Sequence, residues 1–150
     1  MLNIADIMTP EAIAILEGTS GKKQALLDAS HMLAGQTGLS DTSIFRALIE
    51  REALGSTGFG GGVAVPHARV KGLERTNAVF IRLVVPVDYS ANDEAPVDLI
   101  CAIIGPEGPA SESFEALVSA CRALQNPETV SKLRKADCSV AVQTILTEGA

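Results

Sequence analysis

The segment from Val97 to Gly105, VDLICAIIG, constrains the fold more than any other because it is apolar almost throughout. Such a run is typical of a β-strand that is covered on both faces of its sheet. A strand of this kind needs helices or loops on either side, so it favours an α/β architecture. The stiff turn Gly105-Pro106-Glu107-Gly108-Pro109 is predicted to end it.

Three more apolar segments are predicted to be strands. Residues 12–16 (AIAIL) end at Glu17-Gly18, and residues 63–65 (VAV) end at Pro66. Residues 78–87 (AVFIRLVVPV) form the third, and the polar segment 88–96 is a predicted connecting loop. The expected inward residues of the third strand are Val79, Ile81, Leu83 and Val85, with Arg82 as the exception.

Two helices are predicted before the second strand. The first is expected to begin at Thr19 or Ser20 and to stop at Gly35 or Gly38. The second is expected to begin at Ser40 or Asp41 and to end near Gly55. Its predicted buried face consists of Ile44, Phe45, Leu48, Ile49 and Ala53, with Arg46, Glu50 and Glu52 pointing elsewhere.

Three short helices are predicted to close the chain. Ser111 is the expected cap of the first, Asn126-Pro127 begins the next, and Asp137 is the expected cap of the last. These elements predict a single α/β domain over residues 1–150, with a mixed sheet flanked by helices on both faces. The predicted apolar faces are Phe114, Leu117, Val118, Cys121 and Leu124 in the first of these helices and Val140, Ala141, Ile145 and Leu146 in the last.

Charge is distributed unevenly along the chain. The net charge is −6, which disfavours nucleic acid as a partner. Residues 53–82 nevertheless have a net charge of +3, and the remainder has −9. An anionic group would be attracted to the positive segment. Its charged residues are Arg69, Lys71, Arg75 and Arg82 against Glu74.

Several features bear on cellular location. No run of about 18 apolar residues is present, so membrane insertion is not expected. The beginning of the sequence includes Asp6 and Glu11 and lacks the basic region of a secretory signal. Cys101, Cys121 and Cys138 are odd in number and widely spaced, which is typical of small core residues in a reducing compartment. We therefore expect a cytoplasmic protein.

His67 is the candidate for chemistry among the two histidines. A neutral imidazole is a nucleophile near neutral pH, and glycine amides can line an anion site. The pattern fits a histidine that accepts a phosphoryl group, and Pro66 predicts that His67 begins a turn and does not pair in a sheet. His31 is expected to be partly exposed and structural. The loop before His67 contains Ser56, Thr57, Gly58, Gly60, Gly61 and Gly62.

This loop also resembles a known signature. The string Leu54-Gly55-Ser56-Thr57-Gly58, then Gly60, Gly62, Ala64 and Pro66-His67, resembles the active-site motif of mannitol/fructose-type enzyme IIA components of the bacterial phosphotransferase system. Glu50-Arg51-Glu52 and Lys71-Gly72-Leu73 fit as well. The chain is most similar to the nitrogen-regulatory enzyme IIA, over nearly its whole length, which implies the enzyme IIA fold.

The resemblance implies roles for residues and partners. His67 would be phosphorylated by a histidine-phosphorylated carrier protein, and Arg51 would support it from the preceding helix. No cofactor or metal is expected, other partners would be regulatory target proteins, and the chain would be a monomer or weak dimer. Further residues expected to support phosphoryl or partner binding are Ser56, Thr57, Gly58, Gly60, Gly62, Arg69 and Ser113.

The chain departs from the family pattern in two places. Aligning Pro106-Glu107-Gly108 puts Ser113 where many members have a second histidine, so a cationic neighbour of His67 would be lost. Ala68-Arg69 replaces the usual Gly-Lys, and Gly61 stands where asparagine is common. Arg69 keeps the positive charge, although its planar fork differs from an ammonium group.

Several functions remain open. The chain is predicted to be a phosphocarrier of the nitrogen-regulatory type or a binding module whose partners are selected by phosphorylation. A sugar-specific enzyme IIA that donates to an enzyme IIB, and a regulatory module that is no longer phosphorylated, are the alternatives. A hydrolase is disfavoured because the sequence has no nucleophile elbow and no histidine pair with metal-ligand spacing.

Overall fold

The computed structural model describes residues 3–108 and 111–149. Its centre is one mixed six-stranded sheet in the order β1-β5-β6-β3-β2, with β4 also paired to β6. Strand β6 is antiparallel to β5 and parallel to β3 and β4, and every residue in it except Asp98 is buried. The strands are β1 (Ile13–Leu16), β2 (Gly58–Gly60), β3 (Val63–Ala64), β4 (His67–Arg69), β5 (Asn77–Val87) and β6 (Val97–Gly105).

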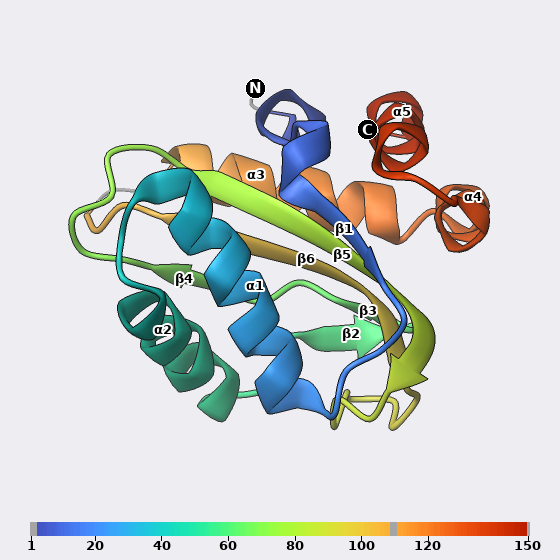
Figure 1. Cartoon of the computed structure of the whole chain (residues 1–150), viewed down its shortest axis with the longest axis horizontal. Helices are drawn as coiled ribbons and strands as arrows, with labels where there is room; N and C mark the ends of the chain where they lie inside the picture. The colour runs from blue at the N-terminus through green and yellow to red at the C-terminus, as the bar shows by residue number, and fades with distance from the viewer. Residues whose placement is uncertain (1–2, 109–110, 150) are drawn as a thin grey trace.

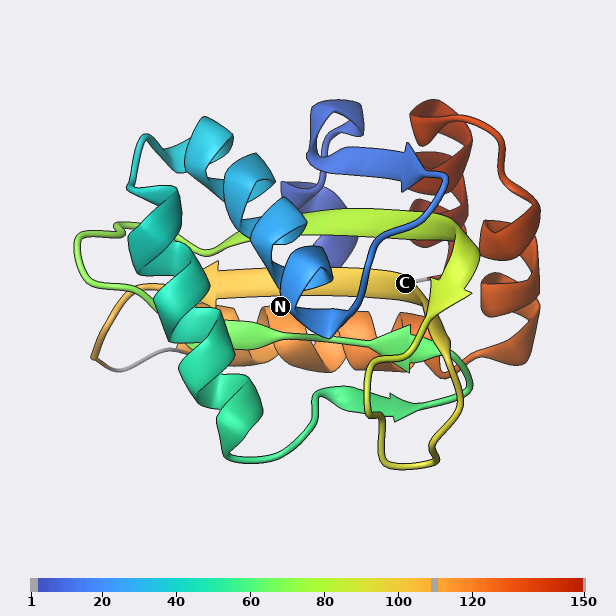
Figure 2. The same cartoon turned by 60° about the horizontal axis from the view of Figure 1, so that its bottom comes forward.

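Helices cover both faces of this sheet (Figures 1 and 2). Helices α1 (Lys22–Thr37) and α2 (Asp41–Ala53) lie over one face, where α1 packs on β5 and α2 on β4. Helix α3 (Ser111–Leu124) packs on β6 from the other face. Helices α4 (Pro127–Lys135) and α5 (Ser139–Gly149) lie together at one end, and α5 contacts β1 and the 3₁₀ segments η1 (Ile4–Ile7) and η2 (Pro10–Ala12). The predicted α/β fold is confirmed.

Local capping chemistry sets most helix boundaries. Ser40 caps α2 by accepting from the amide of Ser43, and Asn126 caps α4, which starts with a proline as predicted. Helix α1 ends at Gly38, whose positive φ of 76° favours glycine. The expected start of α1 at Thr19 or Ser20 was wrong, because Gly21 occupies the cap position.

Two expected caps near the chain's end have other outcomes. The Ser111 cap lies outside the described residues, since residues 109–110 and the side chain of Ser111 are not described. Helix α5 begins only at Ser139, so Asp137 lies one residue too early to be its cap.

For three helices and one strand, the residues that are buried differ in part from those predicted. Helix α3 buries Ala116, Ala120 and Ala123, and Phe114 is 66% exposed because small side chains let the helix backbone approach β6. Helix α2 buries Glu52 in line with Ile44 and Leu48, and Ala53 is exposed. Two further corrections are Val140, which is exposed while Val142 and Leu146 are buried, and Val85, which is exposed where the β5–β6 register shifts between Arg82 and Val87.

His67 is the first residue of strand β4. It pairs with Ile103 of β6, whose N–H donates to the carbonyl of Pro66 at 2.9 Å. The prediction that His67 begins a turn was therefore wrong. Pro66 removes one donor, but its carbonyl still accepts from β6 and the chain continues in extended form. The histidine backbone is consequently fixed by the central strand.

The expectations about membrane spans and cysteines can also be compared with the structure. Within residues 3–108 and 111–149, no helix is long and apolar enough to cross a bilayer. All three cysteines are free; Cys101 is buried, and burial raises the pKa of its thiol to about 12. Cys121 is half-buried and Cys138 is exposed, so Cys138 is not the core residue that was expected.

Candidate functional site

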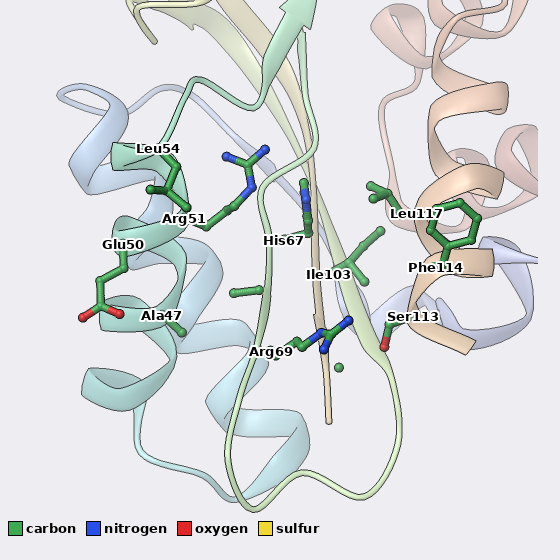
Figure 3. A pocket seen from close by; sticks show the side chains of 12 residues that line it. Ala47, Glu50, Arg51, Leu54, His67, Arg69, Ile103, Ser113, Phe114 and Leu117 are labelled. Carbon is green, nitrogen blue, oxygen red and sulfur yellow. The ribbon is translucent and has the colours of Figure 1, made fainter. Parts of the chain in front are cut away.

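His67 lines a cavity of about 420 Å³ between α2, β4 and the first turns of α3 (Figure 3). Arg51 extends from α2 on one side of the imidazole, and Phe114 and Leu117 of α3 lie on the other. We call this cavity the His67 pocket. Ile103 of β6, which is paired with His67, lies beneath it, so the pocket floor is part of the sheet.

One hydrogen bond fixes the imidazole of His67. Its Nδ1 lies 2.9 Å from the carbonyl oxygen of Val65. A carbonyl can only accept, so Nδ1 must hold the proton. The lone pair of the neutral ring is then on Nε2, which makes Nε2 the nucleophilic nitrogen.

The surroundings of His67 favour its neutral form. Burial lowers the pKa of the imidazole most, and the positive charge of Arg51 acts in the same direction. The hydrogen bond to Val65 and the negative charge of Glu52 oppose these effects, and the resulting pKa lies below the usual value for histidine. A larger fraction of His67 therefore retains its lone pair under mildly acidic conditions.

The structure brings two of the predicted cationic residues to the pocket. Arg51 and Arg69 both line it, and Nη1 of Arg51 also donates to the carbonyl of Gly55 at 2.9 Å. Glu50 lines it too, but its carboxylate points away from the imidazole (Figure 3). Arg82, by contrast, donates to the carbonyls of Arg134 and Ala136. The positive segment seen in the sequence therefore contributes Arg69 to the site but not Arg82.

Ser113 also lines the His67 pocket, at the start of α3. Its hydroxyl is 2.8 Å from the hydroxyl of Thr76, and its side chain fills the space that a Cβ at Gly105 would occupy. The adjacent Glu112 accepts from the amide of Thr76 at 3.2 Å. Two consecutive residues thus attach α3 to the segment before β5, and the Ser113 hydroxyl is already paired.

The hydroxyls and glycines before β3 are not brought to the His67 pocket. Thr57 is buried and donates through its amide and its hydroxyl to Glu52. Ser56 accepts from the amide of Gly58, and the Cα of Gly58 packs against Ala91 so closely that a side chain would collide. These three residues therefore shape the loop, and the donors of Thr57 and the amide of Gly58 are occupied within it.

Gly60 and Gly62 lie in the hairpin of β2 and β3. Neither is among the residues that line the His67 pocket. The hairpin is held by Asp93, which accepts from the amide of Gly61, and by Arg134, which donates to the carbonyl of Gly61 at 2.5 Å. Arg134 also pairs with Asp98 at 2.9 Å. Gly62 has a positive φ of 82° and lies against Arg134 and Asp98, so only glycine fits there.

Two features of the site were missed from the sequence. Leu54 and Phe114 are 86% and 66% exposed and line opposite sides of the pocket, although Phe114 was predicted to be buried. Glu52 was placed on the solvent side of α2, yet it follows Ile44 and Leu48 at successive four-residue intervals. That spacing was a usable signal for burial.

His31 was expected to be structural and partly exposed. Its side chain is 54% exposed and its Nδ1 lies 2.8 Å from Asp41 at the start of α2. It is not among the residues that line the His67 pocket. In the described part of the chain, no group of three or more His, Cys, Asp or Glu side chains is arranged to hold a metal ion.

Comparisons with known proteins identify relatives and solved structures of the same fold. A nitrogen regulatory protein of Bradyrhizobium diazoefficiens is 36% identical over 143 residues, which cover 95% of this chain and 94% of that protein. The crystal structure of the nitrogen regulatory protein IIA-Ntr from Neisseria meningitidis superposes with a TM-score of 0.89 at 32% identity, covering 95% of this chain and 98% of the other. The mannitol IIA of Escherichia coli has the same fold, with a TM-score of 0.76 at 21% identity and coverage of 92% and 97%.

The family model matches almost the whole chain. It covers residues 6–149 and describes the EIIA 2 component of the phosphoenolpyruvate-dependent sugar phosphotransferase system. That span includes every strand of the sheet, the glycine hairpin and His67. The resemblance stated from the sequence is confirmed: this chain belongs to the EIIA 2 family of the phosphoenolpyruvate-dependent sugar phosphotransferase system, and its relatives include nitrogen regulatory proteins.

Proposed function

We propose that His67 accepts a phosphoryl group on Nε2 from a histidine-phosphorylated carrier protein. The observation that carries the proposal is the bond from Nδ1 to the Val65 carbonyl, which leaves Nε2 with the lone pair in a pocket lined by Arg51 and Arg69. Family membership supports phosphotransfer chemistry, and the names of its relatives favour a nitrogen-regulatory role over sugar transport.

The transfer balances without a nucleotide. The phosphorus–nitrogen bond of the donor breaks as the bond from phosphorus to Nε2 of His67 forms. The donor imidazole leaves neutral because its other nitrogen is protonated. Nδ1 of His67 keeps its proton, shared with the Val65 carbonyl, so the phosphorylated ring is positively charged beside the phosphoryl oxygens. Arg51 and Arg69 supply further positive charge to those oxygens.

The rim of the pocket supports a second, regulatory part of the proposal. Leu54 and Phe114 form an exposed apolar pair on either side of His67, and such residues are typical of protein contact surfaces. A phosphoryl group adds roughly −2 charge at this position. We therefore infer that regulatory target proteins dock on the rim and that phosphorylation of His67 weakens their binding by desolvation and repulsion.

Phosphoryl acceptance is tested with phosphoenolpyruvate, enzyme I, the carrier protein and this chain, followed by intact mass. The wild type should gain one acid-labile phosphoryl group. His67→Ala should gain none, because the nucleophilic nitrogen is removed, and His31→Ala should gain one as the wild type does. Labelling that persists in His67→Ala would exclude His67 as the acceptor.

A further inference from the structure

Glu52 is a buried carboxylate on α2 that is not among the residues lining the His67 pocket, and the proposed transfer does not use it. It is 7% exposed and is the one charged side chain that is buried in the part of the chain that the structure describes. It lies in the last turn of α2, next to Arg51. A buried charge is costly unless it is paired and hydrogen-bonded, so the partners of Glu52 indicate what it does.

Four donors surround the Glu52 carboxylate. The amide of Thr57 lies 3.1 Å from Oε2 and the hydroxyl of Thr57 lies 2.5 Å from Oε1. Nζ of Lys22 donates to Oε2 at 2.9 Å, and the hydroxyl of Tyr89 is 3.4 Å from Oε1. Burial alone would raise the pKa of Glu52, but the bonds from Thr57 and Lys22 outweigh it and hold the pKa below its usual value. The group is therefore an anion at neutral pH.

From Thr57 the hydrogen bonds continue to the imidazole. The carbonyl of Thr57 accepts from the amide of Val65 at 3.0 Å. The carbonyl of Val65 in turn accepts from Nδ1 of His67 at 2.9 Å. Val65 thus bonds to Thr57 through its amide and to His67 through its carbonyl. The position of Thr57 therefore sets the position of the Val65 carbonyl. The orientation of the ring depends on that carbonyl.

We propose that Glu52 is a positioning residue for His67, acting through Thr57 and Val65 to hold the imidazole in the Nδ1–H tautomer that exposes Nε2. The consequence for phosphoryl acceptance rests on the proposed function. The positioning itself is a property of the unphosphorylated protein and is measured without any donor.

Glu52 also acts on His67 through its charge. The charged groups around the imidazole are Glu50, Arg51 and Glu52 from α2 and Arg69 from β4; the α3 and β6 residues that line the pocket are uncharged. Arg51 lowers the pKa of His67 and Glu52 raises it, although the two residues are adjacent in sequence. Loss of the Glu52 charge should therefore lower the pKa of His67 further.

The test uses Glu52→Gln, which keeps the shape of the side chain. An amide offers one acceptor oxygen and two donor hydrogens, so it cannot satisfy the donors that converge on the carboxylate. Thr57→Val removes the hydroxyl bond at nearly constant volume, and Thr57→Ser keeps it. Glu128→Gln is the charge control, because Glu128 is exposed on α4 and is not among the residues that line the His67 pocket.

The readout is ¹⁵N and ¹H NMR of the histidine rings in the full chain, which contains only His31 and His67. In Glu52→Gln and Thr57→Val, we expect the Nδ1–H of His67 to exchange with water about tenfold faster, the equivalent of one charge-assisted hydrogen bond. The pKa of His67 should fall in Glu52→Gln. Thr57→Ser and Glu128→Gln should match the wild type in both respects.

The outcomes separate this inference from the proposed function. An unchanged tautomer, exchange rate and pKa for His67 in folded Glu52→Gln would overturn the positioning role, whatever the phosphorylation assay shows. If Glu52→Gln does not fold, an unchanged exchange rate in Thr57→Val overturns it equally. Wild-type protein that shows the NMR behaviour but accepts no phosphoryl group would instead refute only the proposed function.

Discussion

The hydroxyl of Ser113 is bonded to Thr76, at the position where the family resemblance places a second histidine. The substitution therefore exchanges a cationic donor for a residue that attaches α3 to the sheet. Arg51 and Arg69 remain as the pocket's positive charges. The phosphorylated form is accordingly expected to have one fewer charge-assisted bond than a relative with two histidines.

Replacing Ser113 with histidine should restore that donor. We expect Ser113→His to lengthen the lifetime of the phosphorylated form roughly ten- to hundredfold, the range for one hydrogen bond to a charged group. The measurement is a decay time course of the purified phosphoprotein by intact mass. Ser113→Ala is the control and should leave the lifetime unchanged while lowering the free energy of unfolding by about 1 kcal/mol through loss of the Thr76 bond. Equal lifetimes in Ser113→His and wild type would contradict this view of the pocket.

The lowered pKa of His67 predicts the pH dependence of acceptance. Only the neutral ring has a lone pair on Nε2, and its folded-state pKa lies below the ordinary value of 6.5. Acceptance rate plotted against pH should thus fall on acidification with a midpoint below 6.5. The unfolded chain binds the proton more readily than the folded one, so stability contributed by this group should also decrease as pH falls through that range. A midpoint above 6.5, measured with the donor in excess, would disagree with the burial of the ring.

Residue identity could be predicted from the sequence better than residue environment. His67, Arg51, Arg69 and Ser113 were singled out from the motif, and the structure places all four on one pocket. The burial of Glu52 was not predicted, because a carboxylate in the interior is stable only with partners such as Lys22, which is 30 positions away in sequence. The four-residue spacing from Ile44 and Leu48 indicates the face on which Glu52 lies, but a partner at that range leaves no local pattern.

At the level of elements, the residue ranges of the long strands were predicted more accurately than the buried faces of the helices. Strand β6 matches the predicted range of residues 97–105, because a long apolar run has few alternatives. The orientation of α3 was wrong because its alanines do not stand out in an apolar pattern, whereas Phe114 does. The pairing of β4 could not be predicted, since it depends on a parallel partner 36 residues further along the chain.

The glycine hairpin depends on α4 through Arg134. Arg134→Gln removes the pair with half-buried Asp98 and the bond to the Gly61 carbonyl. We expect a loss of about 2 kcal/mol in the free energy of unfolding, measured by urea denaturation, because Asp98 is left without its partner. Lys132→Gln, on the same helix with an exposed pair to Glu128, should cost no more than about 0.5 kcal/mol. Equal losses in the two variants would show that backbone pairing alone holds the hairpin.

For the whole molecule, the prediction of a single domain with helices on both faces followed from alternating helical and apolar segments. The charge distribution was harder to interpret. The sequence placed four basic residues near His67, but only Arg69 of these lines the pocket, and Arg75 lies 3.9 Å from Glu112. The pocket's positive charge comes equally from Arg51 on the preceding helix.

Long-range attraction of the donor's negatively charged phosphoryl group should therefore depend on two arginines. Replacing Arg51 and Arg69 by glutamine should slow acceptance roughly tenfold at low ionic strength and flatten its dependence on salt. The control is the double variant Arg122→Gln with Lys132→Gln, which changes the net charge equally at exposed positions outside the pocket lining. A similar reduction in both double variants would assign the effect to net charge alone.

The apolar rim around His67 has a consequence for timing. Under the proposed function, a donor that delivers the phosphoryl group and a target that responds to it would cover the same Leu54 and Phe114 and would exclude each other. An abundant target protein would then keep most of the chain unphosphorylated and delay the response to a rising donor concentration. The number of target molecules, and not the chemistry at Nε2, would set how long a cell waits before the signal takes effect.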